Sequence, residues 1–305
     1  MHLEIWYTMS INNNNKNQGH NTLHNDVKYL DPKADVTFKL VFGEHEDLVM
    51  SLLNALLPLD EDGQITHVEY LSPEMVPENP GKKYSVVDVR CTDQKKRQFI
   101  VEMQMYWNTY FRQRVILNAS KAVVKQLEAG EDYRLIQPVY CLSLVNHLGF
   151  DTDTDEFYHD YAIVNTAYPE KRIEGLRFVF VELPKFTPKT FVEKKMAVLW
   201  LRFLTEIGED LTKAPKELLE NELTNKALGI VEKSALSDEQ LYAYEQFWRA
   251  VIDEQVLIEG SYTKGVAEGE HNKALDMARK MKSKGYPIEE IAEMTGLTTD
   301  DVKKI

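Results

Sequence analysis

The sequence predicts an α/β protein in which helices flank a mixed β-sheet and a mainly helical C-terminal part follows. Three observations support this fold class. Residues 84–105 carry two runs rich in Val, Ile and Phe around a polar turn, which predicts a β-hairpin. Residues 135–145 form a nearly unbroken apolar run, as expected of a strand buried on both faces. Residues 35–57 and 107–129 have apolar side chains at helical spacing, and the pattern stays helical beyond residue 190.

Length and composition are those of an ordinary globular protein. The chain has 305 residues, 43% hydrophobic and 28% charged, which is enough for one large or two modest domains. No apolar run reaches the length of a membrane span and no secretory signal pattern opens the sequence, so we expect no membrane partner and a cytoplasmic location. Cys91 and Cys141 lie in apolar runs without metal-type spacing, which indicates reduced core thiols.

Changes in pattern divide the chain into four parts. Residues 1–27 are asparagine-rich and aperiodic, which predicts a disordered lead-in. Residues 28–188 contain all the predicted strands and should form the α/β domain. An acidic helical domain is expected over residues 189–262, and residues 263–305 are expected to form a small helical tail.

The first predicted helices lie in residues 35–57, DVTFKLVFGEHEDLVMSLLNALL. Gly43 is expected to divide the segment into a short helix and a longer one, and Pro58 to end the second. Asp35 and Lys39 lie one turn apart, a spacing at which a salt bridge alone would account for both residues.

The hairpin at residues 84–105 carries carboxylates where a strand normally carries apolar side chains. Because side chains alternate along a strand, one face is predicted to be core: Val87, Val89, Cys91, Phe99, Val101, Met103 and Met105. The other face then carries Tyr84, Val86, Asp88, Arg90, Gln98, Ile100, Glu102 and Gln104. If the turn is centred on Lys95, Asp88 and Glu102 face each other.

Two opposed carboxylates at this position indicate a cation site. Directly opposed residues have Cβ atoms about 4.5–5.5 Å apart, where like charges repel unless something neutralises them. Mg²⁺ prefers oxygen ligands and commonly takes one or two carboxylates, so Asp88 and Glu102 are candidate metal ligands. Gln104 follows on the same face, about 7 Å along the strand, and can reach the same site. The alternative is a solvent-exposed face whose acids pair with Arg90 or with lysines elsewhere.

The charge distribution favours a phosphate-binding surface around this hairpin. The net charge is −13, but residues 82–125 contain ten basic and three acidic side chains, which leaves +7 there and −20 elsewhere. Basic residues around an acidic pair suit a phosphodiester, because cations hold its backbone while carboxylates hold a metal. A merely solubilising mixture of charges is the alternative.

The elements after the hairpin are a helix, a loop and a strand. The helix at 107–129 has an apolar stripe of Phe111, Val115, Ala119, Ala122, Val123 and Leu127. Residues 151–155 are acidic but lack the Gly and the distant Glu of an EF-hand, which indicates a loop. A strand is expected over 177–183, ending at Pro184.

Three short helices are predicted in the tail. A helix over residues 274–284 should stop at Gly285, Pro287 suits the first turn of the next, and Thr298 with Asp301 can cap the last. Residues 298–305 hold no Arg, Asn or Gln that would read a base edge. We therefore expect a packing or self-association role, which leaves a homo-oligomer open.

Together these motifs resemble the PD-(D/E)XK nuclease superfamily, and within it the nuclease-family transposases or recombination-promoting nucleases. The resemblance covers most of residues 31–305 and rests on DVTFKLVFG (35–43), Asp88 in VVDVR, Glu102 and Gln104 in IVEMQ, Tyr110, Arg112 and Arg114 in the next helix, and VELPKF (181–186). It implies a restriction-endonuclease-like core, a helix-turn-helix-like tail at residues 263–305, and a metal-dependent DNA endonuclease linked to recombination or mobile elements.

The resemblance also implies roles for individual residues. Asp88 and Glu102 would ligate one or two Mg²⁺ or Mn²⁺ ions, helped by a main-chain carbonyl. Gln104 stands where the superfamily pattern has lysine, and an amide carries no positive charge. We therefore expect Gln104 to orient the attacking water while Lys39 or Arg112 supplies the missing charge. DNA binding is expected from three basic residues, Lys83, Arg112 and Arg114.

Two other functions stay open at this level. The chain could be a catalytically inactive DNA-binding or protein-interaction module on a nuclease fold. Alternatively, the acidic helical half could serve as a partner platform, with the basic core as its nucleic-acid arm. Metal binding at the acid pair together with DNA cleavage distinguishes the enzyme from both.

Overall fold

The structure is a computed structural model that describes residues 28–75, 84–106, 110–147, 149–188 and 195–305. The chain divides after Phe247 into two compact units. The predicted lead-in at 1–27 and Lys83 both lie outside the described residues. Among the helices that are described, none is long and apolar enough to cross a membrane.

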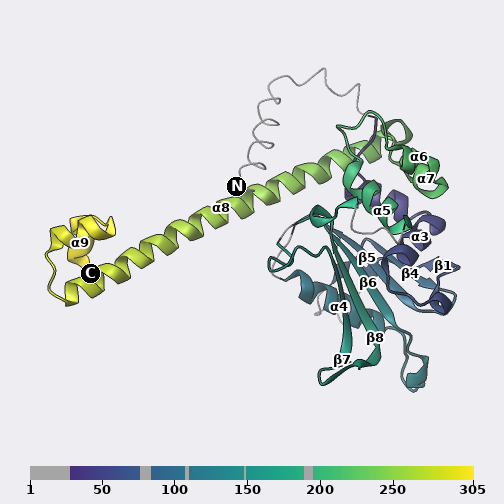
Figure 1. Ribbon diagram of the computed structural model, residues 1–305, viewed down its shortest axis with the longest axis horizontal. Coiled ribbons are helices and arrows are strands. Elements are labelled where there is room, and N and C mark those ends of the chain that lie inside the picture. Colours follow the sequence, from purple (N-terminus) through teal and green to yellow (C-terminus); the bar gives the residue numbers. More distant parts are fainter. Residues whose placement is uncertain (1–27, 76–83, 107–109, 148, 189–194) are drawn as a thin grey trace. The chain divides into compact units, whose positions relative to one another are not determined.

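The first unit is built on a mixed six-stranded sheet with the strand order β1-β4-β5-β6-β8-β7 (Figure 1). β5, β6 and β8 run parallel, and the other neighbouring pairs are antiparallel. The strands are β1 (Val68–Tyr70), β4 (Val89–Asp93), β5 (Gln98–Gln104), β6 (Val139–Val145), β7 (Tyr158–Asn165) and β8 (Tyr168–Glu182). β2 (Glu74–Met75) and β3 (Ser85–Val86) form a separate pair. The mixed sheet confirms the predicted fold class.

Helices pack against both faces of this sheet (Figure 1). One core contains Phe38 and Trp200 together with the β5 residue Val101. The other lies under α4 and contains Phe111 with Ile100. The helices of this unit are α2 (Asp35–Phe42), α3 (Glu46–Leu56), α4 (Phe111–Val124), α5 (Lys195–Glu206), α6 (Lys216–Glu220) and α7 (Glu222–Ile230). The hydrophobic core therefore continues across residue 188, where the sequence predicts a domain boundary.

Gly43 separates α2 from α3, as predicted. Its N–H donates to Lys39 O at 2.7 Å. A Cβ atom on residue 43 would lie only 2.7 Å from the same oxygen, so the close approach requires glycine.

Two predictions for the first unit differ from the structure. The helix predicted over 107–129 ends at Val124, and its predicted first residues, 107–109, lie outside the described residues. β7 has no counterpart in the prediction, and β8 begins at Tyr168 instead of Arg177. The cause is that β7 is an edge strand with two irregularities, at Ala162/Ile163 and Val164/Asn165, which break the apolar alternation that marks a strand.

The last helices of the chain end and begin close to the predicted residues, but the helix that stops before Gly285 is much longer than predicted. One 46-residue helix, α8 (Asp238–Ser283), crosses the boundary expected at 262/263 and stops before Gly285, whose φ is +82°. α9 (Ile288–Thr295) and α10 (Thr299–Lys304) follow. The hydroxyl of Thr298 accepts from Asp301 N at 3.1 Å, which confirms the capping prediction. The small hydrophobic core of the tail contains Ala278, Met281, Ile291, Leu297 and Val302.

Candidate active site

The β4–β5 hairpin has the register that the sequence predicts. The pairs run from Val89 opposite Val101 to Thr92 opposite Gln98, as a turn centred on Lys95 requires. Asp93 fixes that turn, because its Oδ1 accepts hydrogen bonds from the N–H groups of residues 95 and 97 at 3.0 and 2.8 Å.

Asp88 lies in a break between β3 and β4, one residue before the pairing begins. Its Oδ2 accepts a hydrogen bond from Met103 N at 2.6 Å, which holds the carboxylate against the β5 backbone next to Glu102. The prediction that Val87 shares a core face with Val89 is wrong. The break lets Val87 pack on the α4 side, whereas Val89 packs with α2 and α3.

Burial raises the pKa of Asp88 from its ordinary value to about 7. The Met103 N–H opposes this rise, the negative charges of Glu102 and Asp35 add to it, and Lys39 opposes it. The charges of Glu102 on β5 and of Asp35 and Lys39 on α2 therefore act on Asp88.

Two side chains of α4 contact Glu102. Its side chain is buried, Oε1 accepts a hydrogen bond from Asn118 Nδ2 at 2.9 Å, and Oε2 lies 3.3 Å from Arg114 Nη2. Two donors of one helix therefore fix this carboxylate.

Gln104 and Arg114 form the rest of the group around Glu102. Arg114 Nη2 donates to Gln104 Oε1 as well as to Glu102, and Gln104 Nε2 donates to Tyr106 O. The Arg114 guanidinium also lies 4.9 Å from the centroid of the Phe111 ring. Arg114 thus joins the two predicted site residues on β5.

Lys39 and Arg112 are placed differently from each other. Lys39 Nζ pairs with Asp35 Oδ1 at 2.6 Å, which is the salt bridge considered above, and its charge still acts on Asp88. Arg112 Nη2 donates to Phe150 O at 2.9 Å, and its guanidinium lies 4.4 Å from the Phe150 ring centroid. Arg112 therefore contacts the loop that follows β6.

Several basic residues of the +7 segment serve internal contacts. Arg90 Nη2 donates to Gln98 Oε1 at 2.8 Å, and Arg97 Nε donates to Asp93 Oδ2 at 2.7 Å. Both arginines are buried. The basic surface offered to a phosphate backbone is consequently smaller than the sequence count indicates.

Sequence reasoning missed Asn118, which is 1% exposed and contacts Glu102 directly. The position of Asn118 in the sequence does indicate a buried polar residue. Asn118 follows Val115 by three residues and precedes Ala122 by four, so an amide interrupts the apolar stripe of α4. A polar residue in such a stripe points to a buried polar partner.

The VELPKF segment builds a second buried polar cluster. Glu182 Oε1 accepts from Lys185 Nζ at 2.8 Å and lies 2.8 Å from His159 Nε2. Lys185 Nζ also donates to the carbonyl oxygens of Asp151 and Thr154. Because its contacts are with main-chain oxygens of the acidic loop, this cluster secures that loop.

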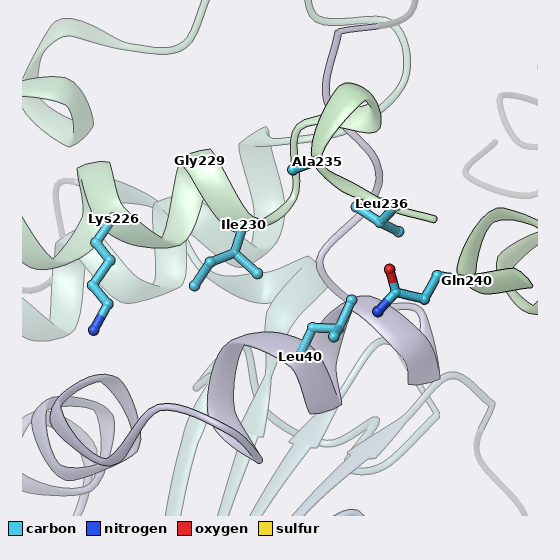
Figure 2. Close-up of a pocket in the computed structure, with 7 residues that line it drawn as sticks. All are labelled: Leu40, Lys226, Gly229, Ile230, Ala235, Leu236 and Gln240. Carbon is cyan, nitrogen blue, oxygen red and sulfur yellow. The ribbon is translucent and has the colours of Figure 1, made fainter. Parts of the chain in front are cut away.

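A cavity of about 300 Å³ lies beside α2 and α7 (Figure 2). It is lined by Leu40, Lys226, Gly229, Ile230, Ala235, Leu236 and Gln240. Lys226 is paired with Asp47 at 2.7 Å, and Gln240 Oε1 accepts from Ser237 N at 2.9 Å. None of the predicted site residues lines this cavity.

A mixed six-stranded sheet flanked by helices, followed by a helical C-terminal part, has the architecture of a PD-(D/E)XK nuclease fold. Residues 32–261 match the sequence model of the PD-(D/E)XK nuclease family transposases. The chain belongs to this family. Comparison with curated proteins gives no match, and neither does comparison with solved structures.

Proposed function

We propose that the chain is a Mg²⁺- or Mn²⁺-dependent DNA endonuclease that hydrolyses phosphodiester bonds during recombination or the movement of mobile elements in the cytoplasm. One observation carries the proposal. The 2.6 Å hydrogen bond from Met103 N holds Asp88 beside the strand position of Glu102. Membership of a nuclease family supports DNA as the substrate.

The residues present fit a hard divalent cation. Asp88 and Glu102 supply two carboxylates, and no group of three or more His, Cys, Asp or Glu with metal-binding geometry occurs in the described ranges. Two carboxylates suffice for Mg²⁺, which keeps several waters and takes substrate oxygens. When bound, the cation lowers the pKa of a water and offsets charge on the scissile phosphate.

Gln104 and Arg114 divide the task that lysine performs in the superfamily pattern. An amide both donates and accepts, so Gln104 can orient a water but cannot carry charge. Arg114 supplies the charge, because its guanidinium contacts both Gln104 and Glu102. Lys39, whose charge acts on Asp88, and Arg112, which contacts Phe150, stay further candidates for this charge.

The second candidate is a DNA-binding module without chemistry. The observation that favours it is the absence of a lysine at position 104, with the Glu102 charge already balanced by Arg114. Such a module would bind DNA with or without metal, because phosphate contacts alone supply most non-specific affinity.

Plasmid cleavage separates the two candidates. The full chain should nick supercoiled DNA with Mg²⁺ or Mn²⁺ and not in EDTA. Asp88→Asn and Glu102→Gln should each lower the rate by about 100-fold or more, the usual cost of losing a group that acts on the transition state. Asp132→Asn, which alters an exposed acid paired with Arg134, is the control and should cut normally. If the wild-type protein retards DNA in a gel but nicks it with neither Mg²⁺ nor Mn²⁺, the chain is the DNA-binding module without chemistry.

A further inference from the structure

We propose that Asn118 is a positioning residue that orients the Glu102 carboxylate through a relay of hydrogen bonds that starts at the partly exposed Lys121 and Ser85 and ends in the buried interior. The inference rests on the proposed function, because Glu102 is taken as a metal ligand. It concerns α4, where the resemblance rests only on Arg112 and Arg114, with Tyr110 directly before the helix.

The relay has three successive contacts of ordinary length. Lys121 Nζ donates to Ser85 Oγ at 2.8 Å, Ser85 Oγ donates to Asn118 Oδ1 at 2.8 Å, and Asn118 Nδ2 donates to Glu102 Oε1 at 2.9 Å. Lys121 also donates to Met75 O at 3.3 Å. The relay therefore joins β2, β3, α4 and β5.

The chemistry of the side chains fixes the direction of these bonds. A lysine ammonium only donates, so the Ser85 oxygen accepts from Lys121 and uses its single proton toward Asn118. The Asn118 carbonyl oxygen then faces Ser85, and its amino group faces Glu102. An inverted amide would set its NH₂ against the donors and its oxygen against the carboxylate. The relay thus presents a donor to Glu102 Oε1.

Burial makes this orientation rigid. Asn118 is 1% exposed and Glu102 6%, and Asn118 sits among Phe111, Val115 and Ala119 in the core under α4. An unmade hydrogen bond in such surroundings costs about 1–3 kcal/mol. Holding Oε1 from the α4 side limits rotation of the carboxylate and so sets the direction of Oε2, which lies 3.3 Å from Arg114 Nη2. Outer contacts of this kind commonly change metal affinity or activity by about 10- to 100-fold.

The test compares full-length wild type with Asn118→Ala, Ser85→Ala and Gln113→Ala. Gln113 is an exposed amide on the same helix, which makes it the matched control. Calorimetry with Mn²⁺ alone should show affinity about 10- to 100-fold weaker for Asn118→Ala, a smaller loss for Ser85→Ala and no change for the control. DNA affinity in EDTA should be the same for the wild type and the three variants, because none of the replaced side chains is among the residues expected to bind DNA. A merely structural Asn118 would lower Tm and leave the Mn²⁺ affinity as it is, which overturns the proposal.

Crystal structures of the wild type and of Asn118→Ala in EDTA test the positioning role of Asn118 independently of whether the protein is a nuclease. If wild type binds no Mn²⁺, the proposed function fails, and the relay is judged on these structures alone. Rotation of the Glu102 carboxylate in the variant supports the positioning role. An unmoved carboxylate overturns it.

Discussion

Replacing Asp88 by asparagine should stabilise the metal-free protein at neutral and alkaline pH. The reason is the raised pKa of Asp88, which reaches about 7 because the carboxyl is buried. Asparagine has nearly the same shape, and its oxygen can still accept the hydrogen bond from Met103 N. The substitution therefore removes a charge without opening a cavity.

The sign of the effect follows from proton linkage. The folded state keeps the Asp88 proton up to a pH of about 7, whereas the unfolded chain releases it near the ordinary value of 3.8. Folding stability thus falls as pH rises between these values and is flat outside them. A pKa change from 3.8 to about 7 corresponds to at most about 4 kcal/mol. Because Asp88 keeps partial contact with solvent, we expect about half, about 2 kcal/mol.

Thermal unfolding in EDTA measures this difference. At pH 8, Asp88→Asn should unfold about 4–8 °C above wild type, and the gap should shrink as pH falls toward 5. Asp93→Asn is the contrasting control, because Asp93 is buried against Arg97 at 2.6 Å and its loss should destabilise. A variant no more stable than wild type at pH 8, or a gap independent of pH, refutes the reasoning.

Three further predictions use other parts of the first unit. Gly43→Ala should lower the free energy of unfolding, measured with urea, by about 1–3 kcal/mol, because the added Cβ would meet the carbonyl oxygen of Lys39. Gly229→Ala is the control: the space around Gly229 is open, so this variant should be slightly more stable than the wild type. Lys185→Met should cost about 3 kcal/mol in the same assay, because it strips a buried carboxylate of a charged partner; a loss below about 1 kcal/mol contradicts this. Mn²⁺ at about 100 times its Kd should stabilise wild type by about 2.7 kcal/mol and leave the Tm of Glu102→Gln unchanged; equal shifts would place the metal elsewhere.

The fold could be predicted where one physical rule governed a segment. The α2–α3 break at Gly43 and the hairpin register around Lys95 were predictable because each depends on a few neighbouring residues. β7 was not, because an exposed edge strand with irregular pairing lacks the apolar alternation that identifies a strand. The continuous core joining Trp200 to the sheet was also hidden, since sequence patterns show which face is apolar but not what covers it.

The surroundings of the candidate site could not be predicted from the sequence. Strand alternation led to Asp88 and Glu102 as candidate acids, but the break at Val87 depends on the β2–β3 pair, which local patterns do not reveal. The partners of Arg112 and Asn118 come from Phe150 and Glu102, thirty-eight and sixteen residues away in sequence. Contacts between distant segments follow from tertiary packing, so propensity and spacing cannot supply them.

The hairpin carries two kinds of acid, and the difference bears on function. Asp93 has a partner for each oxygen, since Arg97 and two main-chain N–H groups contact it, and that acid stabilises the turn. Asp88 receives the Met103 N–H but forms no salt bridge within the described residues, and Glu102 repels it. A residue selected for stability would resemble Asp93, because a buried acid without a countercharge opposes folding. An acid that costs stability beside a second acid is the arrangement that a cation relieves, and this is why the Asp88 and Glu102 pair favours the nuclease over the inactive module.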